Sequence, residues 1–203
     1  KQPLIILTGP TASGKTSLSV SLAKRIGGEI ISADSMQVYR YMDVGSAKVT
    51  KEEMEGVPHH LIDVLDPKEP FDVVRFQTMA KEALKRIRDN GHIPIVAGGT
   101  GFYIQALLND IDFTENDSDT EYRSMLEALS REKGAEYLHE MLRQNDPESA
   151  EAIHANNTKR VIRALEFYKK TGKKISAHNE EERNRQSPYN FAYYVLTMER
   201  ARL

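Results

Sequence analysis

Residues 4–16 constrain the fold of this chain more than any other stretch. A short apolar run at residues 4–7 leads into Gly9, and Gly14, Lys15 and Thr16 follow after four intervening residues. With a helix-like segment at residues 17–26 directly afterwards, the pattern G-x-x-x-x-G-K-[ST] lies between a strand and a helix, as it requires. Backbone N–H groups and the helix N-terminus then surround a phosphate, the lysine reaches the terminal phosphates and the hydroxyl binds Mg²⁺. The predicted phosphate-binding residues are Gly9, Pro10, Thr11, Ala12, Ser13, Gly14, Lys15 and Thr16, with Thr16 as the metal ligand.

Strand-like and helix-like segments alternate along the first half of the chain. Short apolar runs at residues 29–33 and 93–97 read as buried strands. Between them, residues 71–90 carry apolar side chains at spacings of three and four, with Asp72 as the helix cap and Gly91 as the stop. Shorter helices are predicted at residues 50–55 and 102–108. The alternation indicates an α/β fold: a P-loop NTPase-like parallel sheet flanked by helices.

Polar residues follow two of the predicted strands directly. Asp34 ends the strand at 29–33, and Gly98, Gly99 and Thr100 end the strand at 93–97. Because ligands bind beyond the carboxyl ends of parallel strands, Asp34 and Thr100 are expected near the phosphate loop. Asp34 could also cap the next turn, and the glycines could simply form a tight strand–helix turn. The acidic residue that usually ends this strand in a P-loop ATPase is missing.

The composition excludes several classes of protein. The chain contains no cysteine, so it has no disulfide framework, cysteine-ligated metal or thiol nucleophile. No apolar run approaches the roughly 20 residues of a membrane span, and no secretory signal opens the sequence. His59 and His60 lie near Asp63, but no third ligand is evident, so hydrogen bonding at a strand end is preferred to a metal site. We expect a cytoplasmic, monomeric protein without a membrane partner.

The character of the chain changes at residue 112. A polar linker at 115–119 is followed by helical patterns at 120–133, 135–144, 147–155 and 158–171, and the next strand-like run is at 190–198. The predicted organisation is a core domain at 1–111, an all-helical insertion domain at 112–188, and a strand within 189–203 that returns to the core.

The helical insertion contains a strongly basic segment. Residues 155–178 carry one acidic side chain, Glu166, and seven basic ones: Lys159, Arg160, Arg163, Lys169, Lys170, Lys173 and Lys174. The net charge of −2 argues against a general coat for nucleic acids. A local run of one sign is nevertheless compatible with a docking surface for an RNA backbone, and a solvated helix face is the alternative.

These stretches together resemble the tRNA dimethylallyltransferases, also called tRNA isopentenyltransferases. The matching segments are GPTASGKT at 9–16, DSMQVYR at 34–40, HHLIDVLDP at 59–67, GGTGFY at 98–103 and KRVIRALEFYKKTGKKIS at 159–176. The P-loop alone is widely shared, but its combination with the DSMQVYR and RVIRALE segments is specific to this family. The resemblance covers essentially the whole chain.

The resemblance implies a function. Members of this family resemble kinases in fold, but they transfer a dimethylallyl group from dimethylallyl diphosphate to N6 of the adenosine directly 3′ of the anticodon. The P-loop is then expected to hold the diphosphate, with Mg²⁺ as the cofactor. The implied partners are dimethylallyl diphosphate and the anticodon stem-loop of tRNA, whose target base must be unstacked before it reacts.

The resemblance also implies roles for individual residues. Asp34 matches the general base, Lys15 and Thr16 would stabilise the departing diphosphate, and Thr100 and Arg123 match positions near the reacting centre. These five residues are the expected catalytic set. The expected tRNA-binding residues are Asp34, Ser35, Met36, Gln37, Thr100, Arg123, Lys159, Arg160, Val161, Ile162 and Arg163. Family members are longer than this chain, so the C-terminal part of the core domain is expected to lie beyond it.

Two other functions also fit the P-loop. An ATP-dependent nucleoside or small-molecule kinase would explain the loop, with the helical block as a lid. It would explain neither the basic segment nor the Gly98-Gly99-Thr100 strand end. A non-enzymatic switch or RNA-binding module would leave Asp34 and Thr100 without a role.

Overall fold

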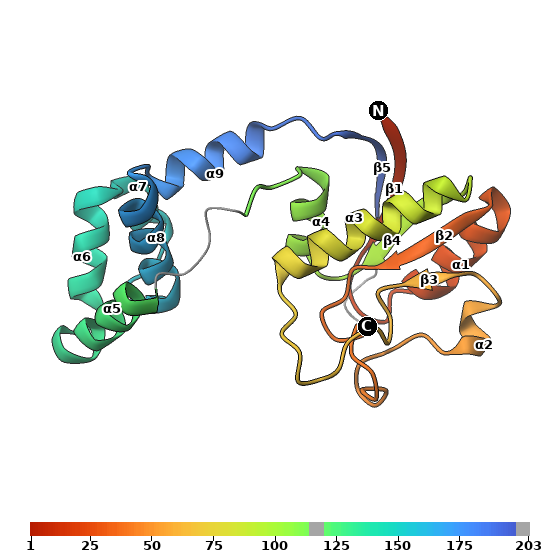
Figure 1. Ribbon diagram of the computed structural model, residues 1–203, viewed down its shortest axis with the longest axis horizontal. Helices are drawn as coiled ribbons and strands as arrows, with labels where there is room; N and C mark the ends of the chain where they lie inside the picture. The colour runs from red at the N-terminus through yellow and green to blue at the C-terminus, as the bar shows by residue number, and fades with distance from the viewer. Residues whose placement is uncertain (114–119, 198–203) are drawn as a thin grey trace. The chain divides into compact units, whose positions relative to one another are not determined.

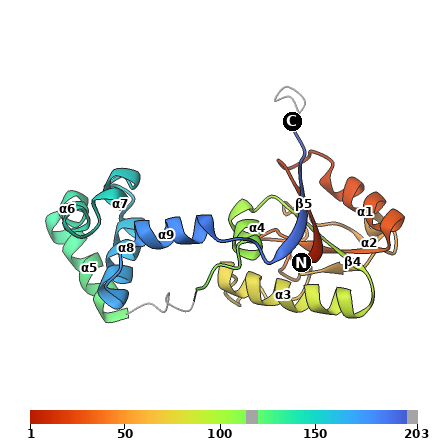
Figure 2. The same ribbon diagram turned by 90° about the horizontal axis from the view of Figure 1, so that it is seen from above.

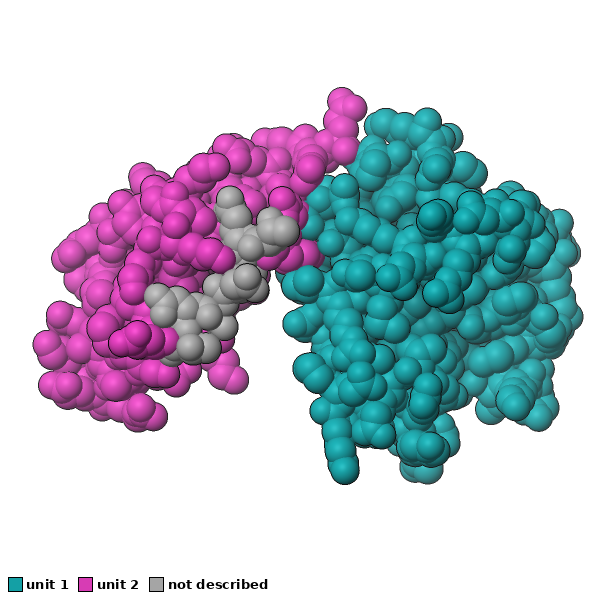
Figure 3. Space-filling view, in the orientation of Figure 1, with its two compact units in different colours: residues 1–111, 187–203 teal, residues 112–186 magenta. Residues whose placement is uncertain are grey.

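The chain is divided into two compact units, which Figure 3 shows in different colours. The computed structural model describes residues 1–113 and 120–197. The first unit contains Lys1–Ile111 and Ser187–Leu203, and the second contains Asp112–Gln186. In the described ranges, no helix is both long enough and apolar enough to cross a bilayer.

The first unit is built on a five-stranded, all-parallel sheet with the order β3-β2-β4-β1-β5. Its strands are β1 (Gln2–Thr8), β2 (Gly28–Ser32), β3 (His59–His60), β4 (Ile93–Gly98) and β5 (Tyr189–Val195). The central strand β4 pairs with both β1 and β2, so the carboxyl ends of all three meet at one edge (Figure 1). This sheet, with helices around it, confirms the predicted α/β fold.

Helices cover both faces of this sheet, as Figure 2 shows for α1 (Lys15–Ile26) and α3 (Val73–Asp89). Successive strand residues point to opposite faces, so Ile31 and Val96 pack with α3 and α4 (Gly101–Leu108), while Ile30 and Ile95 pack with α1. A strand buried on both faces is apolar along most of its length. This is why these strands read as apolar runs, with the buried Glu29 of β2 as an exception that is described below.

Side chains cap two helices of the first unit, and the cap at Asp72 was predicted. Asp72 accepts a hydrogen bond from the Arg75 amide at 2.9 Å and begins α3. The short helix α2 (Lys51–Met54) begins with a capping box between Thr50 and Glu53. Each cap satisfies backbone N–H groups that have no partner within the helix, which fixes where the helix begins.

The strand that contains the two histidines is very short. Only His59 and His60 form the strand β3, and the apolar residues that follow them do not extend it. Leu61 and Asp63 have φ angles of 62° and 54°, in the left-handed region that a strand cannot contain. The chain turns there, and the following residues form a loop instead of extending the sheet.

A buried carboxylate connects β2 to its two neighbouring strands. The Glu29 side chain is 5% exposed, and its two oxygens bond to His60 Nε2 at 2.6 Å and His92 Nδ1 at 2.5 Å. Burial raises the pKa of Glu29, but the hydrogen bonds and charges of His92 and His60 more than offset burial and leave the pKa below its ordinary value. The preference for hydrogen bonding at this strand end is therefore confirmed for His60.

The second unit consists of helices around a separate core. Its helices are α5 (Thr120–Lys133), α6 (Ala135–Asn145), α7 (Pro147–Ala152), α8 (Thr158–Thr171) and α9 (Ile175–Asn184). Apolar side chains from α5, α6 and α8 form this core, among them Leu126, Leu138, Leu142, Val161 and Leu165. Four of these helices follow the predicted patterns closely, whereas α9 was not predicted. The predicted polar linker at 115–119 lies outside the described residues.

Asp146 ties α9 to the rest of the second unit. Its buried carboxylate accepts bonds from the Ser149 amide and hydroxyl at 3.1 and 2.7 Å, and from the Ser176 amide and hydroxyl at 3.0 and 2.7 Å. Burial raises the pKa of Asp146, but the bonds from Ser176 and Ser149 outweigh burial and leave it lowered. One ionised side chain thus caps α7 and fixes the start of α9.

Candidate functional site

The P-loop forms an open helix N-terminus at the carboxyl end of β1. Gly14 is the residue before α1, and its φ of 82° is accessible to glycine with little strain. No side chain caps this end of α1, and no acidic residue occupies its first turn. The Ser13 hydroxyl is buried and has no hydrogen-bond partner within the structure. An open helix end beside an unsatisfied hydroxyl has the chemistry of an anion site.

The Lys15 side chain folds back over its own loop. Its Nζ donates to the carbonyl oxygens of Gly9 at 2.9 Å and Pro10 at 2.5 Å. Burial lowers the pKa of Lys15, and the charge of Asp34 acts in the opposite direction. Lys15 and Asp34 both line the pocket described below.

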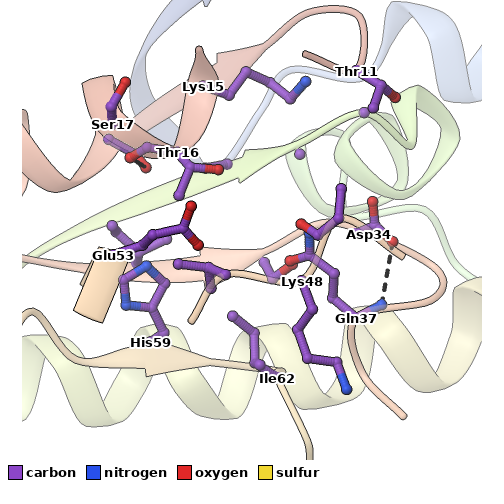
Figure 4. Close-up of a pocket in the computed structure, with 18 of the residues that line it drawn as sticks. Thr11, Lys15, Thr16, Ser17, Asp34, Gln37, Lys48, Glu53, His59 and Ile62 are labelled. Carbon is purple, nitrogen blue, oxygen red and sulfur yellow. Dashed lines mark hydrogen bonds between the residues drawn. The ribbon is translucent and has the colours of Figure 1, made fainter. Parts of the chain in front are cut away.

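Asp34 follows β2 and is fixed by the turn that comes after it. Its Oδ1 accepts hydrogen bonds from the amides of Met36 at 2.8 Å and Gln37 at 3.3 Å, and Figure 4 shows the bond to Gln37. Its Oδ2 makes no hydrogen bond to any described residue. The capping interpretation of Asp34 is therefore correct, and it leaves a second oxygen for chemistry.

Gly98, the last residue of β4, and Gly99, which follows it, have different surroundings. Both line the pocket described below, but Gly98 also lies against the backbone of Ala33, so two strand ends approach each other closely there. The Thr100 amide donates to the Ala33 carbonyl at 3.2 Å, and Thr100 precedes α4. Thr100 therefore lies one residue beyond the pocket wall, next to the residue that precedes Asp34.

These strand ends and the P-loop enclose a pocket of about 540 Å³. Thr11, Lys15 and Thr16 line one side, while Asp34 and Gln37 lie across from them in Figure 4. A third wall was not predicted from the sequence. It consists of residues between β2 and α3, from the loops, α2 and β3: Ala47, Lys48, Val49, Glu53, Glu55, His59 and Ile62.

Lys48 braces this third wall. Its side chain is 5% exposed, and Nζ bonds to Tyr39 O at 2.7 Å, Asp43 Oδ1 at 2.8 Å and Asp63 Oδ1 at 2.6 Å. Burial lowers the pKa of Lys48, but the two carboxylates outweigh burial and leave the pKa raised. No periodicity marks a loop residue of this kind, because its partners are distant in sequence. The only signal in the sequence is that Lys48 lies between Asp43 and Asp63, the two residues whose carboxylates it contacts.

The donor set of the pocket fits magnesium better than a softer metal. No group of three histidine or acidic side chains in the described ranges could hold a metal ion. Mg²⁺ usually takes one or two protein oxygens and completes its shell with phosphate oxygens and water. Thr16 lines the pocket beside the helix N-terminus, where a bound phosphate would supply those other ligands.

The expected RNA-binding residues of the second unit fall into two groups. Lys159, Arg160 and Arg163 are exposed on α8. Val161 and Ile162 are 0% and 4% exposed and belong to the core of the unit, so predicting that their side chains contact tRNA was wrong. The physical reason is helical periodicity: the positions between the charged residues face inward and pack on α5 and α6.

Arg123 is on α5 and has a partner within the second unit. Its Nε and Nη2 donate to the two carboxylate oxygens of Glu166 at 3.0 and 2.6 Å. The Glu166 hydrogen bond is the main reason that the pKa of Arg123 is raised. Both residues stand out in the sequence, but their contact was not predicted, because Arg123 and Glu166 are 43 positions apart and lie on different helices.

Comparison with known proteins gives one consistent answer. A sequence model described as IPP transferase matches residues 37–203. A tRNA dimethylallyltransferase of Lachnoclostridium phytofermentans is 63% identical over 98% of this chain, which spans 64% of that relative's length. A crystal structure of a tRNA isopentenylpyrophosphate transferase from Bacillus halodurans is 48% identical, with a TM-score of 0.65 over 99% of this chain and 62% of that one.

A more distant structure agrees in fold. It is a eukaryotic dimethylallyltransferase acting on tRNA, 33% identical, and it superposes with a TM-score of 0.86 over 98% of this chain and 49% of its own. The present chain thus spans about two thirds or less of the relatives it matches. The matches nevertheless extend across both units and the pocket. The chain belongs to the IPP transferase family.

Proposed function

We propose that this protein transfers a dimethylallyl group from dimethylallyl diphosphate to N6 of the adenosine directly 3′ of the anticodon in tRNA. The observation that carries the proposal is the pocket, in which an open helix N-terminus and Lys15 lie across from Asp34. An anion site opposite a carboxylate suits a reaction in which diphosphate departs and a proton is removed. The named relatives are tRNA dimethylallyltransferases, which supports the same choice.

The reaction needs one bond to form and one to break. The N6 amine attacks the allylic carbon as the carbon–oxygen bond to diphosphate breaks, so the bonding electrons leave with the diphosphate. The exocyclic amine of adenine is a weak nucleophile, and it becomes neutral again only when a base takes its proton. Asp34 is the proposed base, because its Oδ1 is fixed by the Met36 and Gln37 amides while Oδ2 stays available.

The P-loop stabilises the negative charge that develops on the leaving group. Lys15 and the N–H groups at the start of α1 would exchange their present surroundings for diphosphate oxygens. Thr16 would hold Mg²⁺, which would supply further positive charge to those oxygens when bound. The apolar side chains of Ile30, Val49 and Ile62 in the pocket wall suit a hydrocarbon group.

Recognition of the RNA is proposed to involve both units. The turn at Ser35, Met36 and Gln37 would contact the target base and its neighbour, and Thr100 lies beside that turn. The exposed side chains of Lys159, Arg160 and Arg163 would contact the phosphate backbone of the anticodon stem-loop. Arg123, on α5 of the same unit as α8, would also contact the RNA.

Label transfer tests the proposal directly. The protein is incubated with labelled dimethylallyl diphosphate, Mg²⁺ and an anticodon stem-loop with adenosine at the target position. We expect label in the RNA, and about 10²- to 10⁴-fold slower transfer by Asp34→Asn with little change in RNA affinity. Asp89→Asn, which removes an exposed carboxylate at the end of α3, is the matched control and should behave like the unmodified protein. Phosphorylation of a nucleoside by ATP, without label in the RNA, would instead support a kinase.

A further inference from the structure

The ion pair between Arg123 and Glu166 is unequally buried. The Glu166 side chain is 10% exposed, while the Arg123 side chain is 44% exposed. Two parallel N–H···O bonds join them, from Nε to Oε1 and from Nη2 to Oε2. Such a two-point contact fixes both the position and the plane of the guanidinium group. Glu166 is therefore the anchored partner, and Arg123 is held at the surface in one orientation.

The carboxylate of Glu166 stands out among its neighbours. It is the one acidic residue in the basic segment 155–178, where seven residues are basic. On charge alone, an acid there weakens the attraction of this segment for an anion. Glu166 also lies on α8 between the exposed Arg163 and Lys170, on the helix that carries the proposed RNA contacts. A carboxylate at this position must have a benefit other than net charge.

Glu166 uses only one edge of the guanidinium group. Arginine has five N–H donors arranged around a plane, and the bond to Glu166 engages the edge formed by Nε and Nη2. The other edge, which includes Nη1, makes no hydrogen bond to any described residue. That edge can donate two parallel hydrogen bonds to a phosphate group, a geometry that lysine cannot provide.

We propose that Glu166 is a positioning residue that aims the open edge of Arg123 at a phosphate oxygen of the RNA backbone. The proposal rests on the function proposed above, since that function gives Arg123 its ligand. The basic side chains of α8, which belongs to the same unit, are exposed and would contact the same backbone.

The charge effect and the positioning effect of Glu166 have opposite signs, which makes the test sharp. Glu166→Gln keeps the size of the side chain but removes its charge, and its amide N–H₂ group meets the guanidinium donors. If Glu166 acted only through net charge, the variant would bind RNA more tightly. If it positions Arg123, transfer slows by about 10- to 100-fold, because a small misplacement of a contacting group is costly.

A double-mutant cycle separates positioning from a purely structural role. Transfer rates and KM values are measured for the unmodified protein, Glu166→Gln, Arg123→Ala and the double variant. We expect Glu166→Gln to have almost no effect once Arg123 is alanine, and Arg123→Lys not to restore the rate. Glu140→Gln removes a carboxylate from an exposed ion pair with Arg143 on α6, and this matched control should retain full activity.

Binding measurements test the contact with the RNA backbone. A raised KM and Kd for the stem-loop would support this contact, whereas weaker inhibition by inorganic diphosphate with an unchanged Kd for the stem-loop would overturn it. Equal losses from Glu166→Gln with and without Arg123, or a rate that does not fall, would overturn the positioning role. Should Glu166→Gln fail to fold, Glu166→Asp replaces it in the same cycle. If the unmodified protein transfers no label, the proposed function is refuted. In that case RNA binding alone still tests the positioning role, and tighter RNA binding by Glu166→Gln would refute it.

Discussion

Two adjacent glycines with different surroundings provide the sharpest test of this structure. A Cβ atom added at Gly98 would lie 2.2 Å from the oxygen, 2.5 Å from the carbonyl carbon and 2.8 Å from the Cα of Ala33. All three are backbone atoms, which cannot rotate away. A Cβ atom added at Gly99 would meet only the carbonyl oxygen of Gly9, at 3.7 Å, which is an ordinary contact.

The cost of Gly98→Ala follows from these distances. The ends of β2 and β4 would have to separate by roughly 1 Å to restore normal contact distances. Overpacking of this kind costs about 1–3 kcal/mol. The separation would also strain the bonds from Ala33 N to Ala97 O at 2.8 Å and from Thr100 N to Ala33 O at 3.2 Å, each worth about 1 kcal/mol. We expect Gly98→Ala to lose about 3 kcal/mol of unfolding free energy.

Urea denaturation followed by far-ultraviolet circular dichroism measures both variants. Gly99→Ala is the matched control and should change the unfolding free energy by less than about 0.5 kcal/mol. Because Ala33 directly precedes Asp34, Gly98→Ala should also slow prenyl transfer where the protein remains folded. Equal urea midpoints for Gly98→Ala and Gly99→Ala would show that the ends of β2 and β4 are not packed as described. That result would also contradict the described position of Asp34 in the site.

Three further substitutions probe the buried charges and the P-loop. Glu29→Gln should cost about 2 kcal/mol at neutral pH. The pKa of Glu29 is lower in the folded state than in the unfolded state, where it is about 4.3. The contribution of Glu29 to the unfolding free energy is therefore complete above that unfolded value and is lost as the pH falls through the folded value. The urea midpoints of the unmodified protein and Glu29→Gln should converge in acid. Asp146→Asn should destabilise the second unit by about 3 kcal/mol, seen as an earlier loss of helical circular dichroism; an unchanged midpoint would contradict the tie to α9. Lys15→Ala should reduce kcat/KM about 10²- to 10³-fold with RNA affinity unchanged, and a parallel loss of RNA binding would argue for a different role.

The sequence predicts the sheet and the P-loop because their signals are local. The strands β1, β2 and β4 each contain a short apolar run, and the glycines and lysine of the P-loop lie within a few positions of one another. Caps such as Asp72 are equally local, since the side chain bonds to an amide three residues later. Features of this kind depend on spacing alone, which is what a single sequence displays.

The remaining features of the fold and of the site depend on contacts between residues that are distant in the sequence, which the spacing of residue types does not reveal. The third wall of the pocket needs Lys48 to reach Asp63, and the left-handed turn at Leu61 ends β3 against its strand-like composition. Helix α9 has a polar sequence and begins where it does because Ser176 bonds to Asp146, 30 residues earlier. Ile162 was expected at the RNA surface because the resemblance to the family covers residues 159–163 as one segment, although the Ile162 side chain is buried.

The place of β5 at the edge of the sheet has a consequence for how the protein folds. This strand pairs with β1 over seven residues, from Gln2 with Tyr189 to Thr8 with Val195, so the two partners are separated by nearly the whole chain. Closing so long a loop is slow, and on the ribosome β1 can pair with β4 first, whereas its pairing with β5 must wait until β5 has been synthesised. The helices of the second unit make mostly contacts between near neighbours and can form earlier. Gly9 packs directly against Leu196, and therefore we expect the P-loop, although it is made first, to become ordered among the last parts of the protein; pulse-labelled hydrogen exchange would show late protection of its amides.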